Sequence, residues 1–245
     1  MDVVIGVGIG IVVLSAIAGW LGYLWRRQGV WRGRLTEAIP VHSKFWRDRK
    51  LVEGELLYVA IGDSAAQGIG ASRPAHSYVG VIAKRLGAGW RVVNLGISGA
   101  TVRIAIDSEL PALRKLEPDL VTVCIGANDI ARFDPGQFER DIRELFDALP
   151  PHAIVADLPS FYFLPGEKRV LVANRIIRDA AAGRGLVVAP LHARTRKQGL
   201  WGVSTQFAGD LFHPNDRGYR VWASAFEEAV DARLAQLRGD VAPRP

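Results

Sequence analysis

The sequence predicts an α/β fold in which helices cover both faces of a mainly parallel, five-stranded sheet. From residue 56 onward, short apolar runs alternate with longer amphipathic runs. Strand and helix in this order are typical of a parallel sheet, because parallel neighbours need a crossover that a helix usually supplies. The first apolar run also ends in small and polar residues, as strands do at the ligand-binding edge of such a sheet.

The elements follow from length and apolar pattern. The predicted strands are residues 56–61, 91–95, 120–125, 153–156 and 186–189. The predicted helices are residues 77–86, 102–116, 135–149, 168–184 and 216–237. Pro111 falls inside the second of these helices, so that helix is expected to kink or to start later.

Composition narrows the class of protein. The chain has 245 residues, enough for one good-sized domain plus an appendage. Cys124 is the only cysteine, so no intramolecular disulfide can form, and its apolar surroundings indicate a buried strand residue. The five histidines form no pair at metal-ligand spacing, so no structural metal is expected.

The positive charge of the chain is confined to one segment. Residues 26–50 hold eight basic and two acidic side chains, which alone accounts for the formal net charge of +6. The rest of the chain is close to neutral and presents no basic face with interleaved aromatic residues. Nucleic acid is therefore not an expected partner.

The amino terminus predicts a membrane segment. Residues 3–25 carry no charged side chain, and a helix of about 20 apolar residues spans a bilayer core. The competing interpretation is a cleaved signal peptide, because residues 16–18 resemble a cleavage site. Against it, Asp2 is the only charged side chain before the apolar run. Residues 1–25 are therefore predicted to be a retained transmembrane anchor.

The flanking charges predict the orientation of this anchor. Arginines follow the span and no basic side chain precedes it: Arg26, Arg27, Arg32 and Arg34. The positive-inside rule then places the large domain in the cytoplasm, with an extracytoplasmic domain as the alternative. Residues 26–55 are predicted to form a basic juxtamembrane linker, with room for a short amphipathic helix lying on the membrane.

The stretch from residue 58 to residue 71 organises the rest of the chain. An apolar strand ends in Gly62-Asp63-Ser64, which places the Ser64 hydroxyl at the carboxyl edge of the sheet. A helix that begins here would direct its free N–H groups toward the same place and favour negative charge. Ser64 is therefore either a nucleophile beside an oxyanion site or simply the cap of a helix.

Three further stretches reach the same edge of the predicted sheet. They are Asn94-Leu-Gly-Ile-Ser-Gly-Ala-Thr101, Gly126-Ala-Asn-Asp129 and Asp210-Leu-Phe-His-Pro214. With Gly62-Asp63-Ser64 they resemble, in order and spacing, the four sequence blocks of the SGNH/GDSL hydrolase family. The resemblance covers roughly residues 56–237, so the hydrolase domain is taken as residues 56–239, followed by a tail at 240–245.

Acyl transfer to a serine suggests the role of each residue. Ser64 attacks an ester carbonyl once a base takes its proton, and His213 is the candidate base. Asp210 lies three residues before His213, so one helical turn would put both side chains on one face and let the carboxylate hold the imidazole. Ser98 has no companion that would make it a nucleophile.

The resemblance also implies an oxyanion site and a fold. The donors would be the backbone N–H groups of Ser64 and Gly99 and the side-chain amide of Asn128. The fold would be a flavodoxin-like three-layer α/β/α sandwich, and no cofactor would be needed.

These observations predict a serine esterase that hydrolyses carboxylic esters or thioesters through an acyl-enzyme. An O-acyltransferase using the same residues is one alternative. A non-catalytic, membrane-tethered binding module of the same fold is the other.

Overall fold

The computed structural model describes the backbone of residues 2–162, 164 and 166–239. In the first helix, side chains are described at residues 18, 19, 22, 23 and 26 and from residue 28 onward. The predicted tail, residues 240–245, lies outside the described residues.

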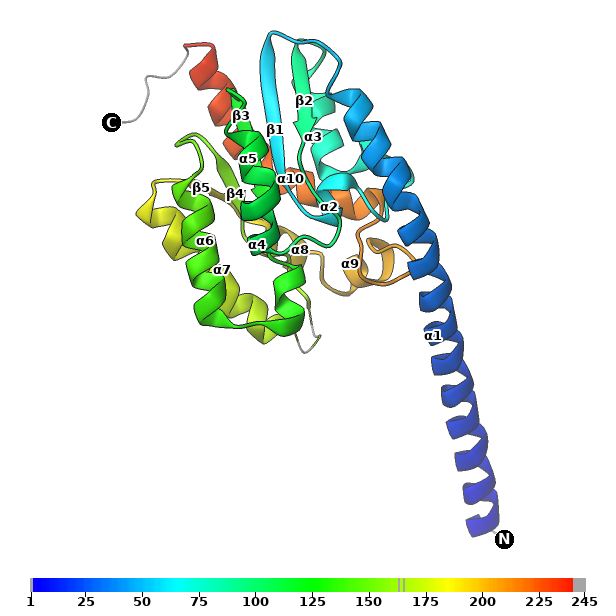
Figure 1. The fold of residues 1–245 in the computed structure, drawn as a ribbon. Coiled ribbons are helices and arrows are strands. Elements are labelled where there is room, and N and C mark those ends of the chain that lie inside the picture. Colours follow the sequence, from blue (N-terminus) through cyan, green and yellow to red (C-terminus); the bar gives the residue numbers. More distant parts are fainter. Residues whose placement is uncertain (1, 163, 165, 240–245) are drawn as a thin grey trace.

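Five parallel strands form one sheet in the order β2-β1-β3-β4-β5 (Figure 1). They are β1 (Leu56–Gly62), β2 (Trp90–Asn94), β3 (Leu120–Cys124), β4 (Ile154–Ala156) and β5 (Val187–Ala189). This confirms the predicted parallel sheet, and every strand begins and ends within one residue of its predicted bounds. The carboxyl ends of β1 and β3 lie side by side, since Gly62 is in register with Cys124.

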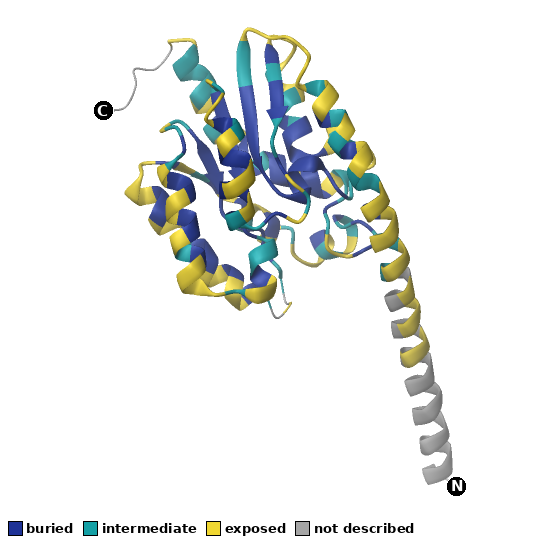
Figure 2. Ribbon diagram, in the orientation of Figure 1, coloured by how far each residue is buried: buried dark blue, intermediate teal, exposed yellow. Residues whose placement is uncertain are grey.

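Helices cover both faces of the sheet and enclose two apolar cores. One core lies beneath α4 (Val102–Ile104), α5 (Leu110–Leu113), α6 (Pro135–Asp147) and α7 (Glu167–Gly183). The other lies beneath α3 (Tyr78–Leu86) and α10 (Asp216–Leu237). Figure 2 shows the strands buried between these layers. The shorter helical segments are α2 (Ser64–Gln67), η1 (Pro74–His76), η2 (Ala105–Glu109), η3 (Asn128–Arg132), α8 (Leu191–Arg196) and α9 (Gly199–Thr205).

The helix predicted at residues 102–116 is interrupted. Between α4 and α5 the chain widens into a π-helical turn, η2, which ends at Glu109, two residues before Pro111. Proline has no N–H to donate, and its ring collides with the carbonyl of the residue four positions earlier. A wider turn at this point removes that collision. Helices α8 and α9 were not predicted, because six and seven residues are too few to show a helical period. Helix α2 is the helix that the sequence allowed to begin at Ser64.

The first helix, α1, runs without a break from Asp2 to Arg49. The segment expected as a linker, residues 26–55, is therefore helical over most of its length. The second half of α1 packs on the domain: Trp46 is buried in the core under α3 and α10, and Leu35 packs with Ile69 and Ala208. Leu35, Ile39 and Trp46 recur at helical spacing, which gives α1 one apolar side.

The predicted membrane segment, residues 3–25, falls mostly on side chains outside the described ones. Among the helices as far as they are described, none combines the length and the apolar character needed to cross a membrane.

Candidate active site

Ser64 lies where β1 turns into α2, at the carboxyl edge of the sheet. Asp63 caps α2, because its Oδ1 accepts the N–H of Ala65 at 2.8 Å. Gly62 allows the end of β1 to lie close to β3, since a Cβ at this position would be 2.7 Å from the carbonyl oxygen of Cys124. Ser64 thus becomes the first residue of α2, with its hydroxyl at the helix N-terminus.

The structure brings Ser64, His213 and Asp210 together in one hydrogen-bonded chain. The Ser64 Oγ lies 3.0 Å from His213 Nε2, and His213 Nδ1 lies 2.6 Å from Asp210 Oδ2. Asp210 is buried, and His213 is partly exposed. This is the geometry that a serine nucleophile, a general base and an orienting carboxylate require.

The loop that carries Asp210 and His213 is a tight turn and not the helical turn that was expected. Leu211 adopts a left-handed conformation with φ 58°, which turns the chain back on itself. The Asp210 Oδ1 then accepts the N–H groups of Phe212 and His213, both at 3.1 Å. Burial alone would raise the pKa of Asp210, but the hydrogen bonds from His213 and these N–H groups lower it below its ordinary value.

The three predicted oxyanion donors lie on neighbouring loops that Asn128 connects. The Asn128 Nδ2 lies 2.9 Å from the carbonyl oxygen of Ala100, next to Gly99, and 3.3 Å from Asp63 Oδ2, next to Ser64. Within the described part of the chain, the N–H groups of Ser64 and Gly99 donate no hydrogen bond. Gly99 has φ 83°, so glycine is favoured there by backbone conformation.

Asp63 and Asp129 adjoin these residues and hold main-chain N–H groups. Asp129 Oδ2 accepts the N–H of Val102 at 3.2 Å. Burial raises the pKa of Asp63 to about 6, although the N–H of Ala65 and the charge of His213 both act to lower it. The Asp63 carboxyl therefore takes up a proton more readily than an exposed aspartate.

Glu109 is a residue of the site that sequence analysis missed. It is buried in the π-helical turn, and its Oε2 accepts the N–H of Gly62 at 2.9 Å. Its Oε1 has no hydrogen-bond partner among the described residues. Burial raises the pKa of Glu109 to about 9, so the side chain is a neutral acid at pH 7. The sequence did indicate that Glu109 is buried, because it lies on the same helical face as the apolar Ile106 and Leu113.

Helix α1 also contacts the site, and this too was missed. The Gln28 Nε2 donates to the main-chain oxygen of Asp210 at 3.0 Å. The indole of Trp31 lies against Gly209, so closely that a Cβ at Gly209 would come within 2.2 Å of it. Farther along α1, the indole N–H of Trp46 donates to the main-chain oxygen of Gln67, the last residue of α2.

A cavity of about 260 Å³ opens beside Ser64 and His213. Its other lining residues are mostly apolar or aromatic. Chief among them are Pro159, Phe161, Tyr162, Leu164, Val203, Phe207, Leu211, Phe212 and Trp222. Such a lining accepts a hydrocarbon group and offers little to a charged one. The described residues contain no cluster of three His, Cys, Asp or Glu side chains that could hold a metal ion.

A family model for the GDSL-like lipase/acylhydrolases matches residues 60–221, about two thirds of the chain. The chain belongs to this family. It is thus a GDSL-type serine hydrolase of carboxylic esters, as its sequence motifs predicted. The matched residues include the strand end at Ser64 and the loop with Asp210 and His213, and they exclude α1.

Solved structures share the fold of this GDSL hydrolase. LAE5, an alpha/beta hydrolase from the metagenome of Lake Arreo, is 24% identical with a TM-score of 0.61, over 74% of this chain and 97% of LAE5. A variant of the acetyl xylan esterase Axe2 from Geobacillus stearothermophilus is 23% identical with a TM-score of 0.60, over 73% and 96%. TesA is 22% identical with a TM-score of 0.60, over 72% and 99%. No curated protein sequence matches the chain.

Proposed function

We propose that Ser64, His213 and Asp210 are the catalytic triad of this GDSL hydrolase and that it works through an acyl-enzyme. The observation that carries the proposal is the unbroken chain of hydrogen bonds from the Ser64 hydroxyl through His213 to Asp210. His213 takes the proton as Ser64 attacks the ester carbonyl, and then returns it to the departing alcohol. Water completes the second half of the cycle by attacking the acyl-enzyme. Asp210 orients the imidazole and stabilises its charged form.

The N–H groups of Ser64 and Gly99 and the amide of Asn128 are proposed to bind the oxyanion. The two N–H groups support this role because neither donates a hydrogen bond within the described residues. Both Asn128 amide hydrogens have acceptors, but the 3.3 Å contact to Asp63 is the longer of the two. The hydrogen in that contact is the one that a developing oxyanion would recruit. Asn128 thus keeps its tie to Ala100 while it donates to substrate.

The cavity beside Ser64 indicates the substrate class. Its volume of about 260 Å³ and its apolar lining suit the acyl half of a short to medium-chain carboxylic ester. The alcohol half would leave toward solvent. Among the related folds, Axe2 is described as an acetyl xylan esterase, so a small acyl group on a larger alcohol belongs to the same proposal.

A panel of p-nitrophenyl esters of increasing acyl length tests this function. The protein should be the full chain, because α1 packs against the loop with Asp210 and a shortened chain would lose those contacts. We expect hydrolysis that rises with chain length until the cavity is filled and then falls. Ser64→Ala should remove the activity at every length. Equal rates for wild type and Ser64→Ala would overturn the proposal.

The two alternative functions are separable in the same assay. An O-acyltransferase would transfer the acyl group to an added alcohol in preference to water, which product analysis distinguishes. Acyl-thioesters in the panel decide between oxygen and sulfur esters. A non-catalytic binding module would give no turnover with any of them.

We also propose, from the sequence alone, that residues 3–25 anchor the protein in a membrane with the hydrolase domain in the cytoplasm. The support is the uncharged run followed by Arg26 and Arg27. Membrane fractionation tests the anchor. A fluorescent protein and alkaline phosphatase, each fused after Pro245, test the side. An active phosphatase fusion would place the domain outside the cytoplasm.

A further inference from the structure

The cavity beside Ser64 opens onto a surface that exposes large apolar side chains. Leu211 and Phe212 line the cavity and are also 56% and 48% exposed. Leu200 and Trp201 on α9 are 77% and 65% exposed and precede Val203, another cavity residue. We call these four residues the apolar rim. Large exposed apolar side chains on two segments that both line a cavity mark a surface that meets a partner.

Leu211 is a costly choice for a position exposed to water. Its φ of 58° lies in the left-handed region, which glycine or asparagine enters far more readily than leucine. More than half of the side chain is exposed, so most of it contributes nothing to the core. The cost is understandable if the Leu211 side chain is buried by something outside this chain.

Basic side chains share the segment that carries Leu200 and Trp201. Residues 191–209 contain Arg194, Arg196 and Lys197 and no acidic residue. Arg196 pairs with Glu167, whereas Arg194 and Lys197 are exposed and form no ion pair within the described residues. The Arg217 guanidinium lies 5.8 Å from the centre of the Trp201 ring, so one basic side chain contacts the apolar rim directly.

We propose that the apolar rim and the adjoining basic residues dock on an anionic lipid surface, so that acyl esters enter the cavity directly from lipid. The proposal rests on the proposed esterase function and names the source of its substrate. Tryptophan, leucine and phenylalanine enter the boundary between headgroups and acyl chains, while lysine and arginine pair with anionic headgroups. A folded acidic protein would satisfy the charges but would have to present a matching apolar pocket. A bilayer accepts all four apolar side chains with no such fit.

The position of this surface agrees with the proposal. Figure 1 shows α9 at the end of the domain where α1 leaves it toward the amino terminus. The described part of α1 at that end carries Gln28 and Trp31, which contact the loop of Asp210. The sequence before it contains the uncharged residues 3–25. A lipid surface that met this end of the domain would meet the apolar rim as well.

The test compares two esters, one soluble and one held in vesicles, and uses the full chain throughout. A soluble p-nitrophenyl butyrate reports the chemistry, and a lipid ester held in vesicles reports docking. The vesicles are either pure phosphatidylcholine or phosphatidylcholine with phosphatidylglycerol. The apolar variant is Leu200→Ser with Trp201→Ser, and the charge variant is Arg194→Gln with Lys197→Gln. None of these four residues lies in the proposed catalytic machinery.

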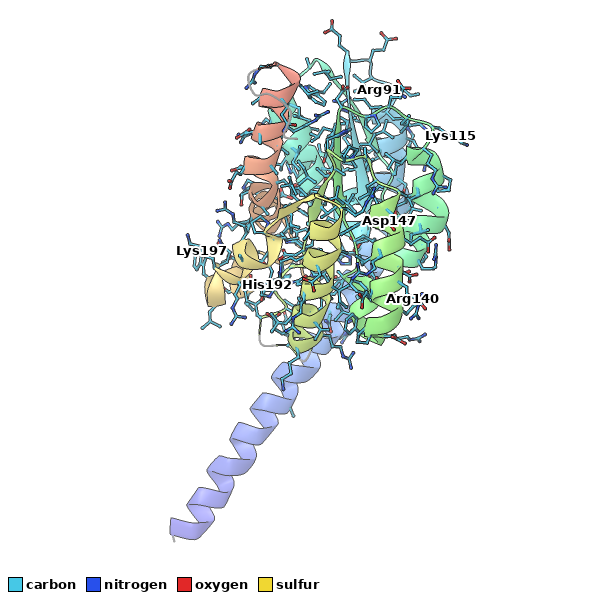
Figure 3. All side chains as sticks on the ribbon, turned by 90° about the vertical axis from the view of Figure 1, so that its left-hand side faces the viewer. Arg91, Lys115, Arg140, Asp147, His192 and Lys197 are labelled. Carbon is cyan, nitrogen blue, oxygen red and sulfur yellow. The ribbon has the colours of Figure 1, made fainter. Side chains whose placement is uncertain are left out.

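A control changes one basic and one apolar side chain on other parts of the surface. Lys115→Gln with Val187→Ser removes one exposed basic and one exposed apolar side chain. Figure 3 shows Lys115 and Lys197 on opposite sides of the molecule. Val187 begins β5, so it lies at the edge of the sheet opposite the site. All variants keep residues 1–50, so any contribution of the amino terminus is the same in each.

We expect wild type to hydrolyse the vesicle ester at least about tenfold faster when phosphatidylglycerol is present. The charge variant should lose that advantage, and the apolar variant should lose at least about tenfold on both kinds of vesicle. All proteins, the control included, should match wild type on the soluble ester. Vesicle rates that stay unchanged in both variants would overturn the proposal. A wild-type rate that is the same with and without phosphatidylglycerol would also overturn it, and would leave an acidic protein as the partner to test. If wild type failed to hydrolyse the soluble ester, that result would instead contradict the esterase function itself.

Discussion

Gln28 Nε2 donates a 3.0 Å hydrogen bond to the main-chain oxygen of Asp210, which ties helix α1 to the loop of the proposed catalytic carboxylate and base. The bond crosses from a helix outside the matched family segment to the centre of the site. Together with the indole of Trp31 against Gly209, it makes α1 part of the support of the active site. We therefore expect Gln28 and Trp31 to act as positioning residues for a reaction that they do not touch.

Gln28→Ala should lower kcat about threefold to tenfold with little change in KM, the scale of one hydrogen bond lost from a supporting loop. The Asp210 carbonyl loses its donor, and the loop that holds His213 becomes less fixed. Steady-state kinetics on a soluble ester measures the effect. Thr36→Ala, on an exposed part of the same helix, is the control and should behave as wild type. A rise in KM at constant kcat would show that Gln28 acts on substrate binding instead.

Gly209→Ala should impair the enzyme because the new methyl group collides with the Trp31 indole. The collision must displace either α1 or the loop with Asp210, and we expect kcat/KM to fall. Adding Trp31→Ala opens the space again and should restore part of the activity. If the double variant were no better than Gly209→Ala alone, the contact between α1 and this loop would not be the cause.

Asn128→Ala should lower kcat by about 10² to 10³ with little effect on KM, the usual result of losing one preorganised oxyanion donor. The variant also removes the contacts to Ala100 and Asp63, so its folding should be checked by thermal unfolding. A large change in KM at constant kcat would make Asn128 a residue that binds substrate in the ground state.

Glu109→Gln should flatten the dependence of stability on pH. Because the folded-state pKa of Glu109 is raised from 4.5 to about 9, the folded protein holds this proton more tightly than the unfolded chain. The stability that Glu109 contributes is complete below the pKa that the side chain has in the unfolded chain. This stability is lost as pH rises through the pKa that the side chain has in the folded protein. Asp63 acts in the same direction at lower pH, between 3.8 and about 6.

The measurement is the free energy of unfolding in urea at several values between about pH 5 and about pH 9. Wild type should lose stability across this range, and Glu109→Gln should lose much less. Glu53→Gln, at an exposed position, is the matched control and should follow wild type. An equally steep decline in Glu109→Gln would mean that another group is responsible.

The sequence was informative where one local pattern decides the structure. Strand β1 and the turn to Ser64 that follows it were predicted because an apolar run and its polar end are visible in the chain itself. The loop with His213 was predicted from its motif, but as a helical turn and not as the tight turn at Leu211. The contacts of Glu109 and Gln28 were not predicted, because each joins residues far apart in sequence. The apolar side of α1 was visible in Leu35, Ile39 and Trp46, but next to residues 3–25 it was assigned to a linker. Packing against Ile69 and Ala208 is what gives that side its partner.

The identity of the nucleophile tests the central claim most directly. The full-length protein should be treated with a fluorophosphonate, which reacts with an activated serine, and the modified peptide should be identified by mass spectrometry. We predict a single label on Ser64, lost in Ser64→Ala and strongly reduced in His213→Ala, because His213 activates the hydroxyl. Ser98 donates its hydroxyl hydrogen to Gln67 Oε1 at 2.8 Å and should remain unlabelled. Labelling at Ser98, or equal labelling of wild type and Ser64→Ala, would contradict the account.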